Sequence, residues 1–190
     1  MEEAENARYL EYRRHIEEDR LPPALRGAIL IFAILQTIVF VPADWILHPD
    51  HFEFFLIGRM AMNAALFAIY FGTVSRWPVL SSVLVCALGT ALFMFMTEDT
   101  GGVTSGYYAG MILLVVGMGV LTPQTAKHSA LIAVMMFCAY LSLPLYSAHP
   151  FEPRLFAQNL VFLAAACAEA YWASLHMDRM RFRDFKQKRE

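Results

Sequence analysis

Six long apolar runs constrain the fold of this chain more than any other feature of its sequence. A bilayer core about 30 Å thick requires about 20 apolar residues in a helix, and each run approaches that length with almost no charge. The runs cover residues 25–47, 54–73, 78–97, 106–121, 129–146 and 155–175. We therefore predict an all-α integral membrane protein that folds as a six-transmembrane-helix bundle.

The overall composition agrees with a membrane protein. Hydrophobic residues make up 58% of the 190 residues, the mean hydropathy is +0.45, and only 17% of the residues are charged. These charges gather near the two ends and in short connectors whose Pro and Gly residues are typical of turns. The connectors include residues 48–51, 98–102 and 149–153. Connectors this short require neighbouring helices to pack antiparallel.

The distribution of Lys and Arg predicts the orientation, because these residues stay in the cytoplasm when they lie close to membrane helices. Arg154 lies in a connector on the opposite side, and Arg59 lies within the second run. The other thirteen lie on the side of the chain ends: Arg8, Arg13, Arg14, Arg20, Arg26, Arg76, Lys127, Arg179, Arg181, Arg183, Lys186, Lys188 and Arg189. We predict a multi-pass membrane protein with both termini cytoplasmic, membrane lipid around it and no nucleic-acid partner.

The segment before the first run is predicted to form a helix of its own. Residues 2–20 are rich in Glu and Arg and carry Tyr9, Tyr12 and Ile16 at helical spacing, which indicates an amphipathic helix that ends at Pro22-Pro23. Two positions remain open for this helix: flat on the membrane surface, or as a collar that touches the C-terminal helix. The predicted domains are an N-terminal cytoplasmic helix (1–23), a transmembrane domain (24–175) and a cytoplasmic connector (176–190).

The last run has no stop signal, because residues 176–190 contain neither Gly nor Pro. We expect the sixth helix to continue into the cytoplasm as an exit helix and the start of a coiled-coil stalk. Leu175, Phe182 and Phe185 fit heptad core spacing, although Asp178 interrupts the pattern. Such a helix is typical of a connector that transmits movement to a downstream domain.

The sequence contains no P-loop, dinucleotide fingerprint, HExxH pair, serine-nucleophile elbow or paired-cysteine metal motif. We expect no enzymatic activity from this chain alone, no catalytic residue, no metal site and no cofactor.

Polar residues that could bind a ligand gather in the outward half of the predicted bundle. Ionisable residues inside a membrane usually form pairs in the bundle interior, so Asp44 is predicted to pair with Arg59. Two interpretations remain open: a salt bridge that fixes the first hairpin beside an aromatic belt, or a small-ligand pocket. The candidate ligand-binding residues are Asp44, Trp45, Arg59, Asn63, Tyr107, Tyr108, Gln158 and Asn159.

Three residues on the last helix are candidates for coupling to a downstream domain: Glu169, Phe182 and Phe185. Glu169 lies above the exit helix, where it could turn toward the inner surface or pair with Lys127 or His128.

Small residues in the fourth run predict close contacts between helices. They are Gly106, Gly110, Gly117 and Gly119.

Histidines raise the alternative of haem b, because a helical bundle can hold haem between two imidazoles. None of them lies deep in an apolar run. The histidines that could form shallow outer or inner sites are His48, His51, His128, His149 and His176.

Three short patterns are shared with a known family. They are Asp44, Pro49 and Arg59; Tyr107-Tyr108-Ala109-Gly110; and Arg179, Arg181, Phe182 and Phe185. In these patterns the chain resembles the six-helix membrane anchors of bacterial class III adenylate cyclases, to which input domains of sensor histidine kinases and diguanylate cyclases are related.

The resemblance implies a homodimeric receptor of the bacterial inner membrane whose exit helices control a cytoplasmic effector, here a cyclase in cAMP signalling, a kinase or a diguanylate cyclase. Some anchors of this kind are thought to bind haem and respond to quinones. The sequence departs from the family at Glu190, where it stops without a cyclase, kinase or GGDEF domain.

Three functions follow as hypotheses. The first is a sensory and dimerising membrane domain that passes a ligand or membrane signal through the sixth helix to an effector, above all an adenylate cyclase. The second is a redox or quinone sensor with haem b. The third, a small transporter or channel, has little support because few charges lie inside the membrane and no inverted repeat is evident.

Overall fold

The computed structural model describes residues 2–188, with side chains described from residue 6; Met1, Arg189 and Glu190, including the basic charge predicted for Arg189, lie outside the described residues. The described part is helical, with no strand in it. The helices are α1 (Glu2–His15), α2 (Leu21–Leu35), α3 (Val41–Leu47), α4 (Phe52–Gly72), α5 (Pro78–Asp99), α6 (Tyr108–Leu121), α7 (Ala126–Leu141) and α8 (Pro153–Gln187). The all-α prediction is confirmed.

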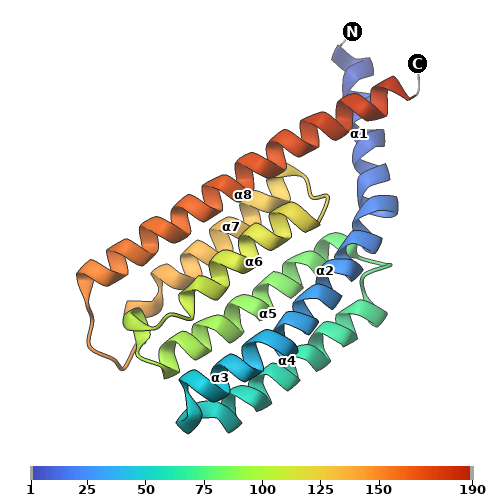
Figure 1. Cartoon of the computed structure of the whole chain (residues 1–190). Helices are drawn as coiled ribbons and strands as arrows, with labels where there is room; N and C mark the ends of the chain where they lie inside the picture. The colour runs from blue at the N-terminus through green and yellow to red at the C-terminus, as the bar shows by residue number, and fades with distance from the viewer. Residues whose placement is uncertain (1, 189–190) are drawn as a thin grey trace.

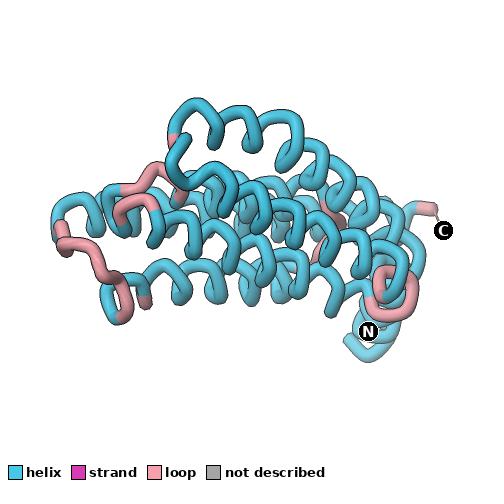
Figure 2. The backbone as a smooth tube through the Cα atoms, turned by 90° about the horizontal axis from the view of Figure 1, so that it is seen from below, coloured by secondary structure: helices cyan, strands magenta, loops and turns pink. Residues whose placement is uncertain are grey.

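The helices from α2 to α8 lie side by side in an antiparallel bundle (Figures 1 and 2). The α5 helix lies inside, in contact with α2, α4, α6 and α7, while α8 packs over α6 and α7. Both views place the two chain termini at the same end of the bundle, which we call the terminal end. Short loops connect the helices at both ends, as the sequence predicts.

The outer surface of the bundle carries large apolar side chains, which is expected where lipid replaces water. Phe71 is 79% exposed, Ile46 73% and Trp172 69%. In the described residues, five helical segments are long and apolar enough to span a membrane, whereas α6 has only 14 residues. A multi-helix membrane protein follows from these features; the count of six crossings stays a prediction.

The prediction that Pro22-Pro23 ends the N-terminal helix is wrong. The chain continues as helix from α1 through a π-helical turn at Ile16–Arg20 into α2, and both prolines lie in the first turn of α2. A proline ring clashes with the carbonyl four residues earlier in a regular helix. The wider π-helical turn just before the prolines, where the Leu21 N–H donates to the Ile16 carbonyl, relieves that clash.

A second π-helical turn, Gln36–Phe40, joins α2 to α3. The predicted fifth run ends earlier than expected, because a 3₁₀ turn at Leu143–Leu145 follows α7 and contains Pro144. The prediction of a continuous exit helix is confirmed, since α8 runs for 35 residues without interruption from Pro153 to Gln187.

Candidate functional site

The predicted ion pair between Asp44 and Arg59 is confirmed and lies at the end of the bundle opposite to the termini. The Arg59 Nε lies 2.5 Å from Asp44 Oδ2, and its Nη2 lies 3.0 Å from Oδ1. Both side chains are almost completely buried. Two parallel hydrogen bonds fix the guanidinium against the carboxylate and join α3 to α4.

Two further side chains complete this group, which we call the outer network: Gln36, Asp44, Arg59 and Tyr107. The Tyr107 hydroxyl donates to Asp44 Oδ1, and Arg59 Nη1 donates to Gln36 Oε1. The Phe40 ring lies 5.0 Å from the Arg59 guanidinium and adds a cation–π contact. The network therefore joins the first two apolar helices to the start of α6.

Sequence reasoning missed Gln36. The only signal was a single amide in an otherwise apolar run, at a depth that could not be matched to a partner without the structure. Its Nε2 is buried and has no hydrogen-bond partner among the described residues. A buried amide with a free N–H can still donate a hydrogen bond to a ligand or to water.

An apolar cavity begins at the outer network. A volume of about 260 Å³ adjoins Asp44, His48 and Tyr107. A second volume of about 320 Å³ follows deeper between α2, α5 and α6, with almost entirely apolar walls. The two volumes share four lining residues: Phe40, Phe93, Gly110 and Leu113. Together they form a groove that is polar at one end and apolar along the rest.

The other predicted ligand-binding residues do not join this network. Asn63 donates to Thr37, and Trp45 is 64% exposed and packs edge-on against Phe52. The exposed position of Trp45 agrees with the aromatic-belt interpretation.

A separate polar group lies on the other side of α6. Asn159 Nδ2 donates to the Val103 carbonyl and to the Tyr140 hydroxyl, both at 3.0 Å, and the Tyr108 ring lies 6.1 Å from that of Tyr140. Gln158 is exposed. Of the eight candidates, three lie in the outer network (Asp44, Arg59 and Tyr107), two lie in this second group (Tyr108 and Asn159), and Trp45, Asn63 and Gln158 lie in neither. A ligand-binding role for any of them stays a prediction.

The α6 helix connects the outer network to α8. A Cβ atom on Gly119 would lie 3.3 Å from the Ala170 Cβ, so the two helices approach closely at that point. Gly110 has no room for a Cβ because the Phe93 ring occupies its place, whereas Gly106 and Gly117 face open space. The prediction of close contacts is confirmed for two of these four glycines.

Glu169 is exposed on the surface of α8. Neither Lys127 nor His128 forms an ion pair or hydrogen bond with it among the described residues, and His128 Nδ1 instead lies 3.1 Å from Thr125 Oγ1. Of the two alternatives left open for Glu169, the described residues show no pairing with Lys127 or His128, and a turn of its carboxylate toward the inner surface stays a prediction. A carboxylate on an apolar, exposed helix face needs a partner from outside the chain or a path to the membrane surface.

At the terminal end, α1 holds α8, which confirms the collar interpretation. The Tyr12 hydroxyl donates to Asp178 Oδ1 at 2.8 Å, and the Phe182 ring lies 5.3 Å from that of Tyr9 and 5.2 Å from that of Tyr12. Phe185 lies 5.6 Å from the Tyr12 ring. We call this group the clasp: Tyr9, Tyr12, Asp178, Phe182 and Phe185.

The clasp changes the interpretation of the exit helix. Phe182 and Phe185, which fit a coiled-coil seam, pack against α1 of the same chain, and Asp178 is buried as the acceptor for Tyr12. Burial and the hydrogen bond to Asp178 raise the pKa of the Tyr12 phenol well above its ordinary value. The phenol therefore stays protonated and remains a donor throughout the physiological pH range.

The histidines are engaged in contacts of other kinds. His51 Nδ1 lies 2.6 Å from Asp99 Oδ2, and the His48 ring lies 5.3 Å from that of Tyr107. His149, in the loop that precedes α8, packs against Gly102 of the turn that follows α5. His176 is exposed. The haem b alternative stays a prediction, and an absorption spectrum of the oxidised and reduced protein tests it through its Soret and α bands.

A helical bundle with a lipid-exposed apolar surface, a buried polar network at one end and a helix clasp at the other defines a membrane domain. A family model, MASE8, matches residues 43–190, well over half of the chain. The chain therefore belongs to the MASE8 family, a family of membrane-associated sensory domains. No curated protein and no solved structure matches the chain.

Proposed function

We propose that this chain is a membrane-embedded sensory input domain that detects a ligand at the outer network and passes the signal through α8 to a cytoplasmic effector. The observation that carries the proposal is the uninterrupted α8 helix, which runs from the network end of the bundle to the terminal end. A continuous helix transmits a shift or rotation along its whole length. In this proposal the chain regulates an enzyme and does not itself catalyse a reaction.

The contacts supply a path for the signal. Tyr107 donates to Asp44 at the outer network and immediately precedes α6. The α6 helix then meets α8 at the tight approach of Gly119 to Ala170. A ligand that competes for the Asp44 carboxylate would release the Tyr107 hydroxyl and alter the position of α6. This movement would reach α8, since close-packed helices shift together.

The groove suggests the kind of ligand. Its polar end presents Asp44, His48 and Tyr107, and its deeper part is lined by apolar side chains. A ligand with one hydrogen-bonding group and an apolar body fits such a groove, and a molecule of this kind dissolves in the bilayer. We propose that the ligand enters from the membrane.

The effector is proposed to be a class III adenylate cyclase, with a kinase or a diguanylate cyclase as the alternatives. A cyclase site forms between two catalytic halves, so the chain acts as a homodimer in this proposal. In the proposed dimer, a second copy of the chain would supply a partner for the exposed Glu169 carboxylate on α8.

A fusion of the full chain to a cyclase catalytic domain tests the proposal. The fusion is reconstituted in vesicles, and cAMP formation is measured with extracts of membrane lipid separated by polarity. At least one fraction should change the rate several-fold. Tyr107→Phe removes the hydrogen bond that the ligand is proposed to break, so its rate without ligand should lie near the ligand-bound rate of the parent and should no longer respond to the fraction.

The matched control is Tyr171→Phe, which removes a hydroxyl from a half-exposed position on α8 away from the groove. It should respond as the parent does. A parent fusion whose rate is the same with every fraction, or a Tyr107→Phe fusion that responds like the parent, would show that the outer network does not sense a ligand.

A further inference from the structure

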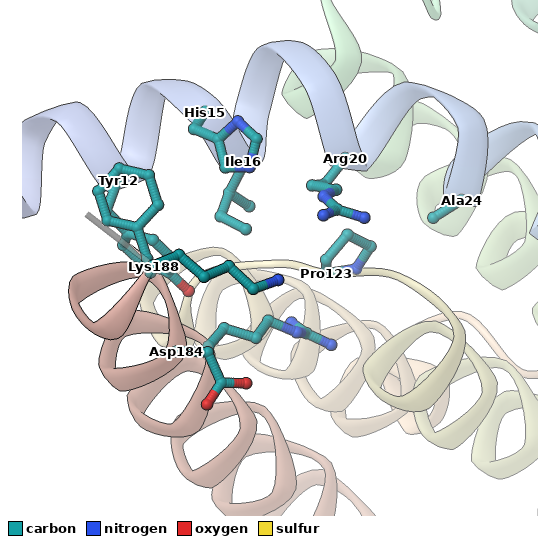
Figure 3. Close-up of a pocket in the computed structure, with 10 residues that line it drawn as sticks. Tyr12, His15, Ile16, Arg20, Ala24, Pro123, Asp184 and Lys188 are labelled. Carbon is teal, nitrogen blue, oxygen red and sulfur yellow. The ribbon is translucent and has the colours of Figure 1, made fainter. Parts of the chain in front are cut away.

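A cavity of about 460 Å³ lies at the terminal end between α1 and α8, on the opposite side of the bundle from the outer network. Its walls come from the last turns of α1, the start of α2, the loop after α6 and the end of α8 (Figure 3). The volume is many times the roughly 30 Å³ of a water molecule. The lining residues that matter are Arg20, Arg181, Asp184, Lys188 and Pro123.

Positive charge dominates this cavity. Arg20, Arg181 and Lys188 each bring a cation to it, whereas Asp184 brings one carboxylate. In Figure 3, Arg20 and Lys188 extend toward each other from opposite helices, near Pro123, and the carboxylate of Asp184 points away from Arg20. None of the three cations forms an ion pair with a carboxylate among the described residues.

Arg181 gives a second, independent sign of a missing partner. Its Nη1 is buried and has no hydrogen-bond acceptor in the described part of the chain, while its Nη2 has only the weak acceptor Met177 Sδ at 3.8 Å. A buried guanidinium N–H without an acceptor costs more than a neutral donor in the same position, so native proteins satisfy such groups. An anion in the cavity would supply the acceptor.

We propose that this cavity binds a phosphate group, with Arg181 and Arg20 as hydrogen-bonding guanidiniums and Lys188 as a third charge. Arginine forms paired hydrogen bonds with phosphate oxygens, and lysine adds a compact charge. The phosphate belongs either to the headgroup of an anionic lipid or to a soluble phosphate compound. Apolar walls from Ile16 and Ala24 next to the basic residues can hold the adjoining part of a lipid.

Binding at this place would strengthen the clasp. Arg20 ends the π-helical turn that follows α1, and Arg181 and Lys188 flank Phe182 and Phe185 in the sequence of α8 and its end. One phosphate that contacts all three cations therefore joins the N-terminal helix to the exit helix. Occupancy of the cavity would hold α8 against α1 independently of any ligand at the outer network.

Binding to the full chain is measured by native mass spectrometry after purification, with two probes. The first probe is phosphatidylglycerol added to the protein in neutral detergent; the second is ATP or inorganic phosphate. The triple variant Arg20→Gln, Arg181→Gln, Lys188→Gln should raise the Kd of at least one probe by about tenfold or more, because charge-assisted hydrogen bonds are lost.

The control has the same charge change elsewhere: Arg14→Gln, Arg179→Gln, Arg183→Gln, all exposed and outside the cavity. Loss of phosphatidylglycerol binding in the cavity variant alone identifies a lipid site, and loss of ATP or phosphate binding alone identifies a soluble ligand. Equal loss in both triple variants, or no saturable binding of any probe to the parent, overturns the proposal.

The unfolding temperature of the parent chain provides a test that does not depend on the folding of a variant. A ligand that binds only the folded state raises the unfolding temperature. The parent in nanodiscs of neutral lipid should unfold at a higher temperature when the phosphate probe that binds is added. An unfolding temperature that stays the same with every probe contradicts the proposal.

Discussion

At the scale of single residues, the ion pair inside the bundle is fully partnered, whereas Gln36 Nε2, Thr90 Oγ1 and Thr97 Oγ1 are buried without a hydrogen-bond partner among the described residues. Residues at matching depth on the two helices of one hairpin can be paired from sequence alone, which is why Asp44 and Arg59 could be predicted. The sequence alone could not predict that Gln36 belongs to the outer network, or which of Tyr107 and Tyr108 contacts Asp44. Neighbouring residues on a helix point about 100° apart, and the packing of α6 decides which tyrosine faces Asp44.

Arg59→Gln should destabilise the bundle strongly. It leaves the Asp44 carboxylate buried with Tyr107 as its main donor, and removal of one partner from a buried ion pair costs about 3–5 kcal/mol. The double variant Asp44→Asn, Arg59→Gln should lose less stability than Arg59→Gln alone, because no unpaired charge remains buried. The free energy of unfolding in mixed micelles measures both.

Arg154→Gln is the control for the loss of a positive charge, since Arg154 is exposed at the start of α8. It should leave the free energy of unfolding within about 0.5 kcal/mol of the parent. A double variant that is as unstable as Arg59→Gln would show that the charge imbalance is not the cause.

The clasp should depend on pH in one direction. The pKa of the Tyr12 phenol is raised in the folded chain, whereas an unfolded tyrosine titrates near pH 10. Stability from this hydroxyl is therefore fully present below about pH 10 and falls as the pH rises above it, because the unfolded phenol loses its proton first. Thermal unfolding from neutral to alkaline pH measures this loss.

Tyr12→Phe provides the comparison for that experiment. It removes the donor to the buried Asp178 carboxylate and should cost about 1–3 kcal/mol at neutral pH. The variant should also show a smaller fall in stability than the parent above pH 10. An equal fall in both proteins would assign the alkaline transition to other groups.

At the scale of the helices, sequence patterns predicted where the chain is helical better than where helices begin and end. Pro22-Pro23 is a strong stop signal, yet the π-helical turn at Ile16–Arg20 lets the helix continue. That turn follows the part of α1 that packs on α8, and a single segment of sequence does not contain such long-range contacts. Pro144, in contrast, acts as its local chemistry predicts and lies in the 3₁₀ turn after α7.

Gly110→Ala should weaken the contact of α6 with α5. The added methyl group would overlap the Phe93 ring, and the ring has to move. Overpacking of this kind costs about 1–3 kcal/mol, more than the gain in helix propensity from Gly to Ala. The unfolding temperature in detergent should fall.

Gly117→Ala in the same helix is the matched control, because nothing lies within 4 Å of a Cβ at that position. It gains about 1 kcal/mol of helix propensity without a clash. Its unfolding temperature should equal or exceed that of the parent. A fall as large as that of Gly110→Ala would mean that the Phe93 contact is not what limits position 110.

At the scale of the whole molecule, the all-α bundle and its tight hairpins follow from apolar length and connector length. The outer network and the clasp, at the two ends of the bundle, depend on tertiary structure. The outer network joins residues from three segments, and the clasp joins residues 166 positions apart in the sequence. Aromatic residues at helical spacing in both end segments were the only signal for the clasp, and they fitted a coiled coil between two chains equally well.

The last prediction concerns the path of the chain across the membrane. The 14 residues of α6 rise about 21 Å at 1.5 Å each, less than a hydrocarbon core of about 30 Å. Yet α5, α6 and α7 lie side by side in alternating directions, so α6 connects the two ends of the bundle (Figure 1). We expect α6 to cross the bilayer, with Tyr107 and Thr122 at opposite surfaces and the membrane thinned or the adjacent turns buried beside it.

Reporter fusions decide this topology. Green fluorescent protein, which matures in the cytoplasm, should be bright after Gln124 and after Lys188, and alkaline phosphatase, which is active only outside, should be active after Gly101 and after Pro150. The excess of basic residues at the terminal end gives the direction. If fusions after Gly101 and Gln124 report the same side, α6 does not cross. Five crossings would place the two chain ends on opposite sides, which is incompatible with the contact of Tyr12 with Asp178 in the clasp, so that result would contradict both this arrangement of α6 and the signal path proposed through it.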